Sequence, residues 1–461
     1  MAAPAWLPAW LAARVHGRPL VASMLANIAW LMLDKVLKLV VGLGITVWLA
    51  RHLGPQAFGQ YSYVLAFVAM FSGLATLGLP TIAVRELVRA RQAEPPAQGA
   101  AEARAQRAAE AEILGTTLAL LLAGATLAVA LILAVALWVR PEAPALRLGI
   151  ALVAGTLLFQ TSALVRWWFE SRVAARAAVL AETLALLAGA ALKAALILAD
   201  APLWTFFAAV LTEAALLAVL LALAWRSMRA GVGRWRPRLA RAASLMRGAW
   251  PLALSGAVLM VQARVDQFML AELADDRELG YYGVALRVAE GLVFIALALQ
   301  STMFPALVQA RQAADGSFRR KLMSYYRASF VAALVVCVPL ALLGQPLVLL
   351  LFGPAYAPAG WLLVLMAARV FLAFVGIARS AFLVVDNLQH YATFTVIVGT
   401  LLNVLLNLWW IPTHRAEGAV WASLVSFAVT IFVLDLAHPR ARANVLDLVR
   451  AAASLHRLRS A

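Results

Sequence analysis

Long apolar stretches alternate with short, mostly basic segments along the whole chain. Four of these stretches carry no charged residue: 113–139, 148–165, 328–352 and 391–413. Eight more contain only isolated charges: 22–50, 59–84, 173–199, 202–225, 248–271, 281–309, 358–385 and 418–437. A helix needs about 20 apolar residues to cross a hydrocarbon core of about 30 Å, so the pattern predicts about twelve transmembrane helices. A β-barrel would instead show alternating polarity in segments of about ten residues.

The composition agrees with a membrane protein and leaves little sequence for a soluble domain. Of 461 residues, 64% are hydrophobic and 13% are charged, whereas about a quarter are charged in soluble domains. The single cysteine, Cys337, excludes an intramolecular disulfide. The six histidines have no ligand spacing, and no GxxxxGK[ST] phosphate loop occurs. We therefore expect no metal, no cofactor, no catalytic residues and no ATP-driven step.

Basic residues are unequally divided between the two sides that twelve crossings define. About two thirds of the 39 lysines and arginines lie before the first span, in alternate loops and after the last span. The other side has only Arg51, Arg140, Arg147, Arg277 and Arg415. Because loops rich in lysine and arginine stay in the cytoplasm, both termini are expected there. Anionic inner-leaflet lipids, rather than nucleic acid, then explain the net charge of +17.

The chain also contains an internal repeat. The letters LA followed by FGQY at 49–61 align with LA followed by LGYY at 270–282, and each pair joins one span to the next. Six spans per half give a parallel repeat, which predicts an all-α protein with two six-helix lobes around a central cavity. The expected divisions are a lead-in at 1–21, an N-lobe at 22–225, a basic linker at 226–247, a C-lobe at 248–437 and a basic tail at 438–461.

One stretch of the chain resembles a known family. The sequence LARHLGPQAFGQYSYVLAFVAMFSGLATLGLPTIAVREL at 49–87 is similar to the opening signature of bacterial polysaccharide flippases. These form the O-antigen translocase branch of the multidrug/oligosaccharidyl-lipid/polysaccharide exporter superfamily. Stretches 250–305 (WPLALSG, VDQFMLAEL and LGYYGVALRVAE) and 351–423 (LFGPAYAPAG, NVLLNLWWIP and EGAVWAS) agree with it.

The resemblance implies a function and a location. It implies transport of a polyprenyl-diphosphate-linked oligosaccharide to the outer leaflet of the bacterial inner membrane, for surface polysaccharide synthesis. Alternating access would be driven by a proton or sodium gradient. Polymerase and chain-length proteins of the same pathway are further candidate partners.

Charged residues within the spans are the candidate functional groups, since burying them in a bilayer costs at least about 2.5 kcal/mol each. Asp34, Lys35 and Lys38 lie about 18 to 24 Å into the first span, which is near mid-membrane. The seventh span carries Arg264 and Asp266, the eighth carries Arg287 and Glu290, and the tenth carries Arg369. Glu182, Lys193 and Glu213 rank lower, and Arg379 is expected to extend toward the membrane surface.

Two interpretations of these charges remain open. In one, Asp34 pairs with Lys38 and Asp266 pairs with Arg287, and the pairs only hold helices together. In the other, the cations Lys35, Lys38, Arg264, Arg287 and Arg369 bind the diphosphate or acidic sugars. Asp34, Asp266 and Glu290 would then couple transport to an ion.

Two rival functions are distinguishable. A multidrug or organic-cation antiporter of the same superfamily would need a net negative cavity, whereas these groups carry a surplus of positive charge. A membrane glycan ligase or polymerase would need a sizeable outer loop, and the outer connections are short.

Overall fold

The computed structural model describes residues 19–92, 100–172, 176–228, 235–313 and 316–454, with the side chains of 19–34, 92 and 100–103 left out. The predicted lead-in at 1–21 therefore lies outside the described residues, apart from the first backbone turn of α2. The described residues are helical almost throughout, with no strand among them.

Ten helical stretches are long and apolar enough to cross a membrane within the described ranges. Two of them reverse direction, at Gly54 in α2 and at Arg415 in α14, where the backbone leaves the helical region. Both positions have positive φ, which glycine adopts without strain. Each of these two stretches therefore contains two segments, which makes twelve segments in the described ranges, the number that the sequence predicts.

The N-lobe contains the helices of the first half of the chain. They are α2 (Pro19–Met70), α3 (Ser72–Thr76), α4 (Leu79–Gln92), α5 (Ala100–Val139), α6 (Pro144–Phe159), the 3-10 turn η1 (Gln160–Ser162), α7 (Ala163–Ser171), α8 (Arg176–Leu198) and α9 (Leu203–Ser227).

The C-lobe contains the helices of the second half of the chain. Its helices are α10 (Leu239–Leu273), α11 (Asp276–Ala313), α12 (Ser317–Phe352), the 3-10 turn η2 (Pro354–Tyr356), α13 (Ala357–Val385), α14 (Gln389–Ala428), the π-helix η3 (Val429–Val433), α15 (Leu434–Ala437) and α16 (Pro439–Ala453).

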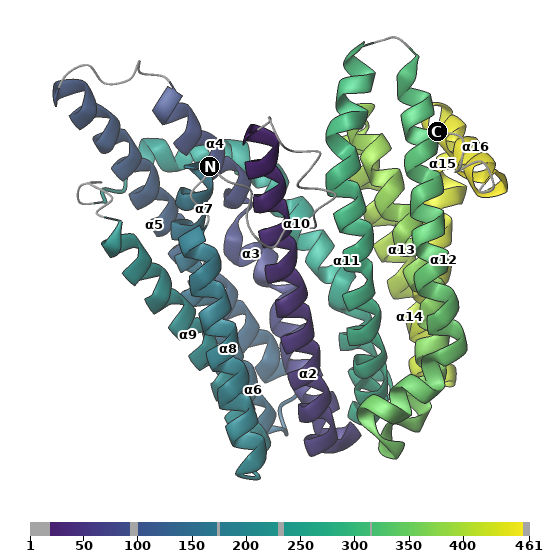
Figure 1. Cartoon of the computed structure of the whole chain (residues 1–461). Helices are drawn as coiled ribbons and strands as arrows, with labels where there is room; N and C mark the ends of the chain where they lie inside the picture. The colour runs from purple at the N-terminus through teal and green to yellow at the C-terminus, as the bar shows by residue number, and fades with distance from the viewer. Residues whose placement is uncertain (1–18, 93–99, 173–175, 229–234, 314–315, 455–461) are drawn as a thin grey trace.

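The two lobes diverge toward the end of the molecule where α2 begins and α16 lies (Figure 1). We call this the basic end, since the arginine-rich helices α4 and α16 lie there. We call the other the hairpin end, since the reversals at Gly54 and Arg415 lie there. A large apolar core joins the lobes toward the hairpin end, and each lobe has its own smaller core toward the basic end. This distribution of cores lets the lobes meet at one end and separate at the other.

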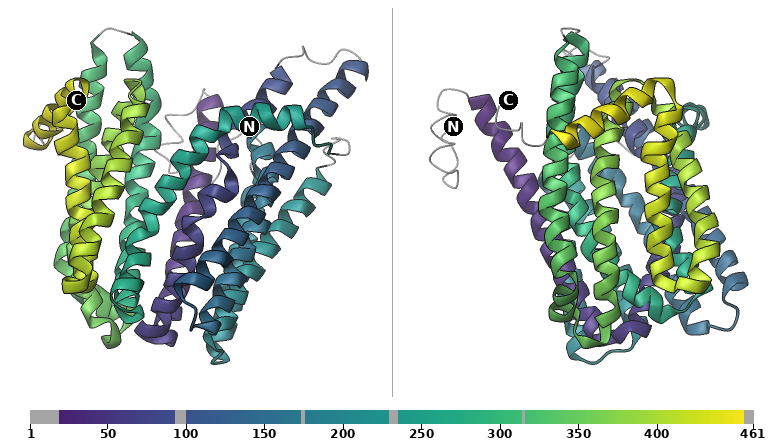
Figure 2. Two further views of the ribbon diagram at one scale, coloured as in Figure 1. Left: turned by 180° about the vertical axis from the view of Figure 1, so that it is seen from behind. Right: turned by 90° about the vertical axis from the view of Figure 1, so that its right-hand side faces the viewer.

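Helix α10 connects the lobes. Its first part runs across the basic end and its second part descends into the C-lobe (Figure 2). Pro251 lies between the two parts, where its missing N–H weakens the helix. Before α10, the backbone N–H of Arg236 donates to the Ala111 carbonyl at 3.4 Å, and Glu112 of α5 pairs with Arg238 and Arg241. The described part of the basic linker is thus fastened to the N-lobe.

Candidate functional site

A cavity of about 680 Å³ lies between the lobes, toward their point of contact. Its walls come from α2, α6, η1, α8 and α9 of the N-lobe and from α11 of the C-lobe. Phe58 and Tyr61, close to the hairpin end, are among the lining residues. Six charged side chains also line it: Lys38, Glu182, Lys193, Glu213, Arg287 and Glu290.

The carboxylates of the N-lobe wall are paired with cations. Lys38 Nζ lies 2.9 Å from Glu182 Oε2, which joins α2 to α8, and Arg166 approaches the other oxygen of Glu182 at 3.2 Å. Lys193 Nζ lies 2.6 Å from Glu213 Oε2, which joins α8 to α9. Glu182, Lys193 and Glu213, which the sequence ranked low, therefore belong to the cavity wall.

The C-lobe wall differs in having an unpaired cation. Glu290 accepts a hydrogen bond from Arg264 of α10 at 2.9 Å and makes no ion pair with Arg287 on its own helix. Arg287 is exposed to the cavity and has no carboxylate partner among the described residues. It is the only cavity-lining cation, within the described part of the chain, that lacks one.

Arg369 and Lys35 lie outside this cavity. Arg369 lines a smaller pocket of about 210 Å³ with Glu290, and its guanidinium lies 5.6 Å from the centre of the Phe427 ring. Its buried Nε has no partner. Lys35 is exposed and lies 5.5 Å from the Phe294 ring centre, between α2 and α11. The side chain of Asp34 is outside the described residues, so its predicted pairing with Lys38 stays a prediction.

Asp266 lies within the C-lobe and not in the cavity wall. Its Oδ2 accepts hydrogen bonds from Tyr282 at 3.1 Å and from Ser423 at 2.5 Å, and its Oδ1 accepts one from Asn407 at 2.8 Å. The predicted pair of Asp266 with Arg287 is wrong, because the two side chains face different sides of the hairpin. All three donors are neutral. The adjacent Oδ1 of Asn407 is buried without a partner.

Asn403 completes this polar cluster, which we call the Asp266 cluster: Asp266, Tyr282, Asn403, Asn407 and Ser423. The Asn407 amide also donates to Asn403 Oδ1 at 3.2 Å. The bond to Asn403 lies within α14, whereas the bond to Asp266 joins α14 to α10. A single carboxylate surrounded by uncharged oxygen atoms can take up a proton or a monovalent cation. The described residues contain no group of three histidines, cysteines or acidic residues that could hold a metal ion.

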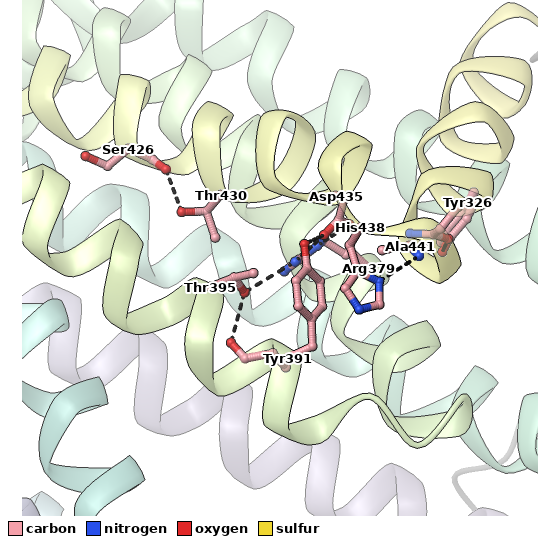
Figure 3. Close-up of polar contacts among 11 residues, drawn as sticks. Tyr326, Arg379, Tyr391, Thr395, Ser426, Thr430, Asp435, His438 and Ala441 are labelled. Atoms are coloured by element: carbon pink, nitrogen blue, oxygen red, sulfur yellow. Dashed lines mark hydrogen bonds and ion pairs between the residues drawn. The ribbon is translucent and has the colours of Figure 1, made fainter.

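A second buried charge cluster lies nearer the basic end of the C-lobe (Figure 3). Arg379 donates two hydrogen bonds to Asp435, at 2.7 and 2.6 Å, and both side chains are buried. Tyr391 donates to the same carboxylate at 3.0 Å. The expectation that Arg379 of α13 extends to the membrane surface is therefore wrong, because Asp435 of α15 neutralises its guanidinium inside the lobe.

Contacts between the lobes close the hairpin end. Arg140, after α5, approaches Glu272 at 2.9 Å and Asp276 at 3.1 Å, and lies over the Tyr63 ring at 4.4 Å. Arg51 donates to backbone carbonyls at the end of α12. Loop arginines that the sequence had used only to count charge therefore join the two lobes.

Several of these residues gave no local signal in the sequence. Ser423 and Tyr282 are common residue types in apolar stretches, and only the packing of α10, α11 and α14 brings them to Asp266. Tyr281 and Tyr282, near the start of α11, are both buried, whereas Trp409 of α14 is 70% exposed.

Comparisons with known proteins agree with this architecture. Residues 24–311 match the family described as "Polysaccharide biosynthesis protein". No curated protein matches the sequence. The solved structures described next are 10%, 12% and 16% identical to this chain, and at these identities they show a shared fold.

The solved structures include the lipid II flippase MurJ in an inward closed conformation, with a TM-score of 0.68 and 10% identity over 92% of this chain and 90% of that one. An inward-facing multidrug resistance MATE family transporter of the MOP superfamily has a TM-score of 0.68 and 12% identity, over 90% and 96%. A MOP superfamily transporter from Pyrococcus furiosus has a TM-score of 0.58 and 16% identity, over 92% and 95%.

Proposed function

Because this chain belongs to the family of polysaccharide biosynthesis proteins, we propose that it is a flippase for a lipid-linked sugar. The cargo is a polyprenyl-diphosphate-linked oligosaccharide, carried from the cytoplasmic to the outer leaflet of a bacterial inner membrane for surface polysaccharide synthesis. The observation that carries the proposal is Arg287, a cation without a carboxylate partner among the described residues, exposed in a cavity whose own carboxylates are all paired.

The charges of the cavity favour an anion over a cation. A diphosphate can bind the Arg287 guanidinium through two oxygen atoms at once. Lys38 and Lys193 face the same space, and an anion can attract them without separating them fully from Glu182 and Glu213. A cationic drug would need an unpaired carboxylate, and each of the three in this wall already has a cation within 2.9 Å. The antiporter alternative is therefore less well supported.

The shape of the molecule supports alternating access with the basic end in the cytoplasm. The lobes separate at that end, while Arg140, Glu272 and Asp276 hold them together at the other. In this conformation, cargo enters the cavity from the cytoplasmic side. Separation of the Arg140 contacts and closure of the basic end would then present it to the outer leaflet.

The Asp266 cluster is the proposed coupling site. A buried carboxylate bonded only to neutral donors has an unneutralised charge, which a proton or sodium ion would remove. Tyr282 on α11 and Asn407 on α14 both contact Asp266, so a change in its charge alters the packing between these helices. Ion binding can thereby bias the conformation of the C-lobe.

A deletion and complementation experiment tests the proposal. In cells lacking the gene, the lipid-linked oligosaccharide should accumulate on the cytoplasmic leaflet and surface polysaccharide should be lost. The wild-type gene and the control variant Arg311→Ala should restore export, since Arg311 lies on the same helix outside the cavity and pairs with Asp386. Arg287→Ala should restore the protein level but not export. Normal export without the gene would refute the proposed function.

A further inference from the structure

Polar and small residues line one face of the helices between Asp266 and the basic end. On the first half of α14, every fourth residue is of this kind, so successive members adjoin and form a row that turns gradually around the helix: Tyr391, Thr395, Gly399, Asn403 and Asn407. On the segment that follows the Arg415 reversal, Ser423, Ser426, Thr430 and Asp435 are all buried. We call these two rows the C-lobe seam. It begins at the Asp266 cluster and ends at the Arg379–Asp435 ion pair.

The two rows meet midway along the seam. A Cβ added at Gly399 would lie 2.4 Å from Thr430 Oγ1 and 3.8 Å from Gln262 Nε2. The glycine thus lets α14 approach Thr430 closely, and polar atoms of α10, α14 and η3 converge there. Thr430 belongs to the π-helix η3, a widened turn of a kind frequently found at functional sites.

The spacing of the seam suits a relay. Successive groups on α14 are four residues apart, which is about 6 Å along the axis. One water molecule can bridge two polar groups at such a separation. Ser426, Thr430 and Thr395 each donate to a backbone carbonyl three or four residues before them, so their hydroxyl oxygens can still accept, although one lone pair of Thr395 already accepts from Arg379.

The buried ion pair between Arg379 and Asp435 closes the C-lobe seam on the side of the basic end. Asp435 is held by Arg379 and Tyr391, and the same Arg379 guanidinium donates to Thr395 Oγ1 at 3.3 Å (Figure 3). His438 lies against Tyr391 with ring centres 4.1 Å apart, just beyond this pair. Well-packed apolar residues would hold these helices together at least as well as a buried ion pair does. The pair therefore points to a role besides stability.

We propose that the C-lobe seam carries a proton between the basic end and Asp266, and that the Arg379–Asp435 pair is its gate. The inference rests on the proposed ion exchange at Asp266. A proton leaves a hydronium ion in the cytoplasm, passes along the hydroxyl groups and ends as a new O–H bond on the Asp266 carboxylate. The carboxyl group is then neutral, and its O–H can donate to Asn407 Oδ1, the buried acceptor that has no partner. Release reverses these steps.

Infrared spectroscopy of the full-length protein after a rapid fall in pH tests the route. Asp266 should give a protonated carboxyl band that Asp266→Asn abolishes. Thr430→Val and Thr395→Val keep the side-chain shape but remove a relay hydroxyl, so the band should appear about tenfold more slowly in each. Thr393→Val is the matched control, since Thr393 is half-buried on the same helix as Thr395, and the hydrogen bond its hydroxyl donates goes to its own turn, at the Gln389 carbonyl. Its rate should equal that of the wild type.

The gate is tested by the double variant Arg379→Gln, Asp435→Asn, which removes both charges together. The band should appear faster than in the wild type. An unchanged or slower rate would overturn the gate. Wild-type rates in both valine variants, with the full band reached at equilibrium, would overturn the seam and leave ion exchange at Asp266 intact. If the wild-type protein shows no Asp266 band at any pH, proton exchange itself fails and the seam with it.

Discussion

Arg287 and Lys193 show how two cations in one cavity can serve different purposes. Lys193 is 13% exposed and contacts Glu213, whereas Arg287 is open to the cavity without such a partner among the described residues. The paired lysine fixes α8 against α9. The unpaired arginine keeps its hydrogen-bonding capacity for the proposed cargo. Substitutions at Arg287 therefore test binding, whereas substitutions at Lys193 and Glu213 test stability.

For Arg287, we expect a difference between lysine and alanine substitutions. Arg287→Ala removes the cation and should weaken binding of a polyprenyl diphosphate probe by about 100-fold, since hydrogen bonds to charged groups contribute roughly 1.5 to 3 kcal/mol. Arg287→Lys keeps the charge but loses the two-point contact, so its affinity should fall between those of the alanine variant and the wild type. Calorimetry in detergent measures the affinities. Equal affinities for all three proteins would leave Arg287 without a role in binding.

For the half-buried Lys193–Glu213 pair, Glu213→Gln should lower the thermal unfolding temperature, because Lys193 then lies in the cavity wall without its carboxylate. The loss in the free energy of unfolding should be smaller than the roughly 3 to 5 kcal/mol lost when a fully buried pair is broken, since water reaches this one. Adding Lys193→Met should restore most of it. If the double variant is no more stable than the single one, the pair is not what stabilises this contact.

Adjacent spans could be predicted for these residues, but their partners could not. The positions of Asp266 and Arg287 on the seventh and eighth spans suggested a pair. Helix rotation then separates them, since Arg287 faces the cavity between the lobes and Asp266 faces Asn407 and Ser423 inside the C-lobe. A partner contributed by α14 could not be inferred from positions on α10 and α11 alone.

At the scale of helices, the lobes make backbone contact at two glycines. A Cβ added at Gly59 of α2 would lie 1.6 Å from the Asp276 carbonyl oxygen, and one added at Gly280 of α11 would lie 2.0 Å from the Pro55 carbonyl oxygen. No side chain can move aside to relieve such overlaps, because the obstructing atoms are backbone. The glycines of the aligned FGQY and LGYY sequences therefore permit the hairpin end to close.

Gly59→Ala and Gly280→Ala should each hold the hairpin end open. Spin labels at positions 142 and 277, on opposite lobes in a Cys337→Ala background, should report a longer distance in either variant than without it. Gly42→Ala, on the same helix as Gly59 but with no atom within 4 Å of its added Cβ, should leave the distance unchanged. An unaltered distance in both test variants would show that the lobes do not close through these glycines.

The helices themselves follow from hydropathy, but their breaks required the structure. The sequence placed span ends near Gly54 and Arg415, and the chain reverses at both. It did not predict that α10 begins at Leu239 and bends near Pro251. The first turns of α10 carry arginines, and a charged helical segment cannot be told from a loop when only the length of apolar stretches is counted.

For the whole molecule, orientation is the first property to establish. We expect an impermeant maleimide added outside cells to label Glu142→Cys at the hairpin end and to spare Lys321→Cys at the basic end, both in a Cys337→Ala background. Excess positive charge on the basic end is the physical reason. Labelling of position 321 but not 142 would reverse the topology and, with it, the direction from which cargo enters.

The two-lobe architecture could be expected from the internal repeat, whereas the conformation could not. Which end of the cavity is closed depends on a few contacts such as those of Arg140, whose energies are small beside those of the cores within each lobe. A hydropathy pattern is the same in every state of a transporter. The closed hairpin end is therefore a property of the folded molecule alone.

The most direct test of the central claim is a translocation measurement with the purified protein. A fluorescent polyprenyl-diphosphate-linked disaccharide is placed in liposomes that contain the wild-type protein or Arg287→Ala, and an impermeant quencher reports the fraction left in the outer leaflet. The account predicts that the wild-type protein moves the lipid between leaflets and that Arg287→Ala slows this by about tenfold or more. A wild-type rate equal to that of protein-free liposomes, under every ion gradient applied, would contradict it.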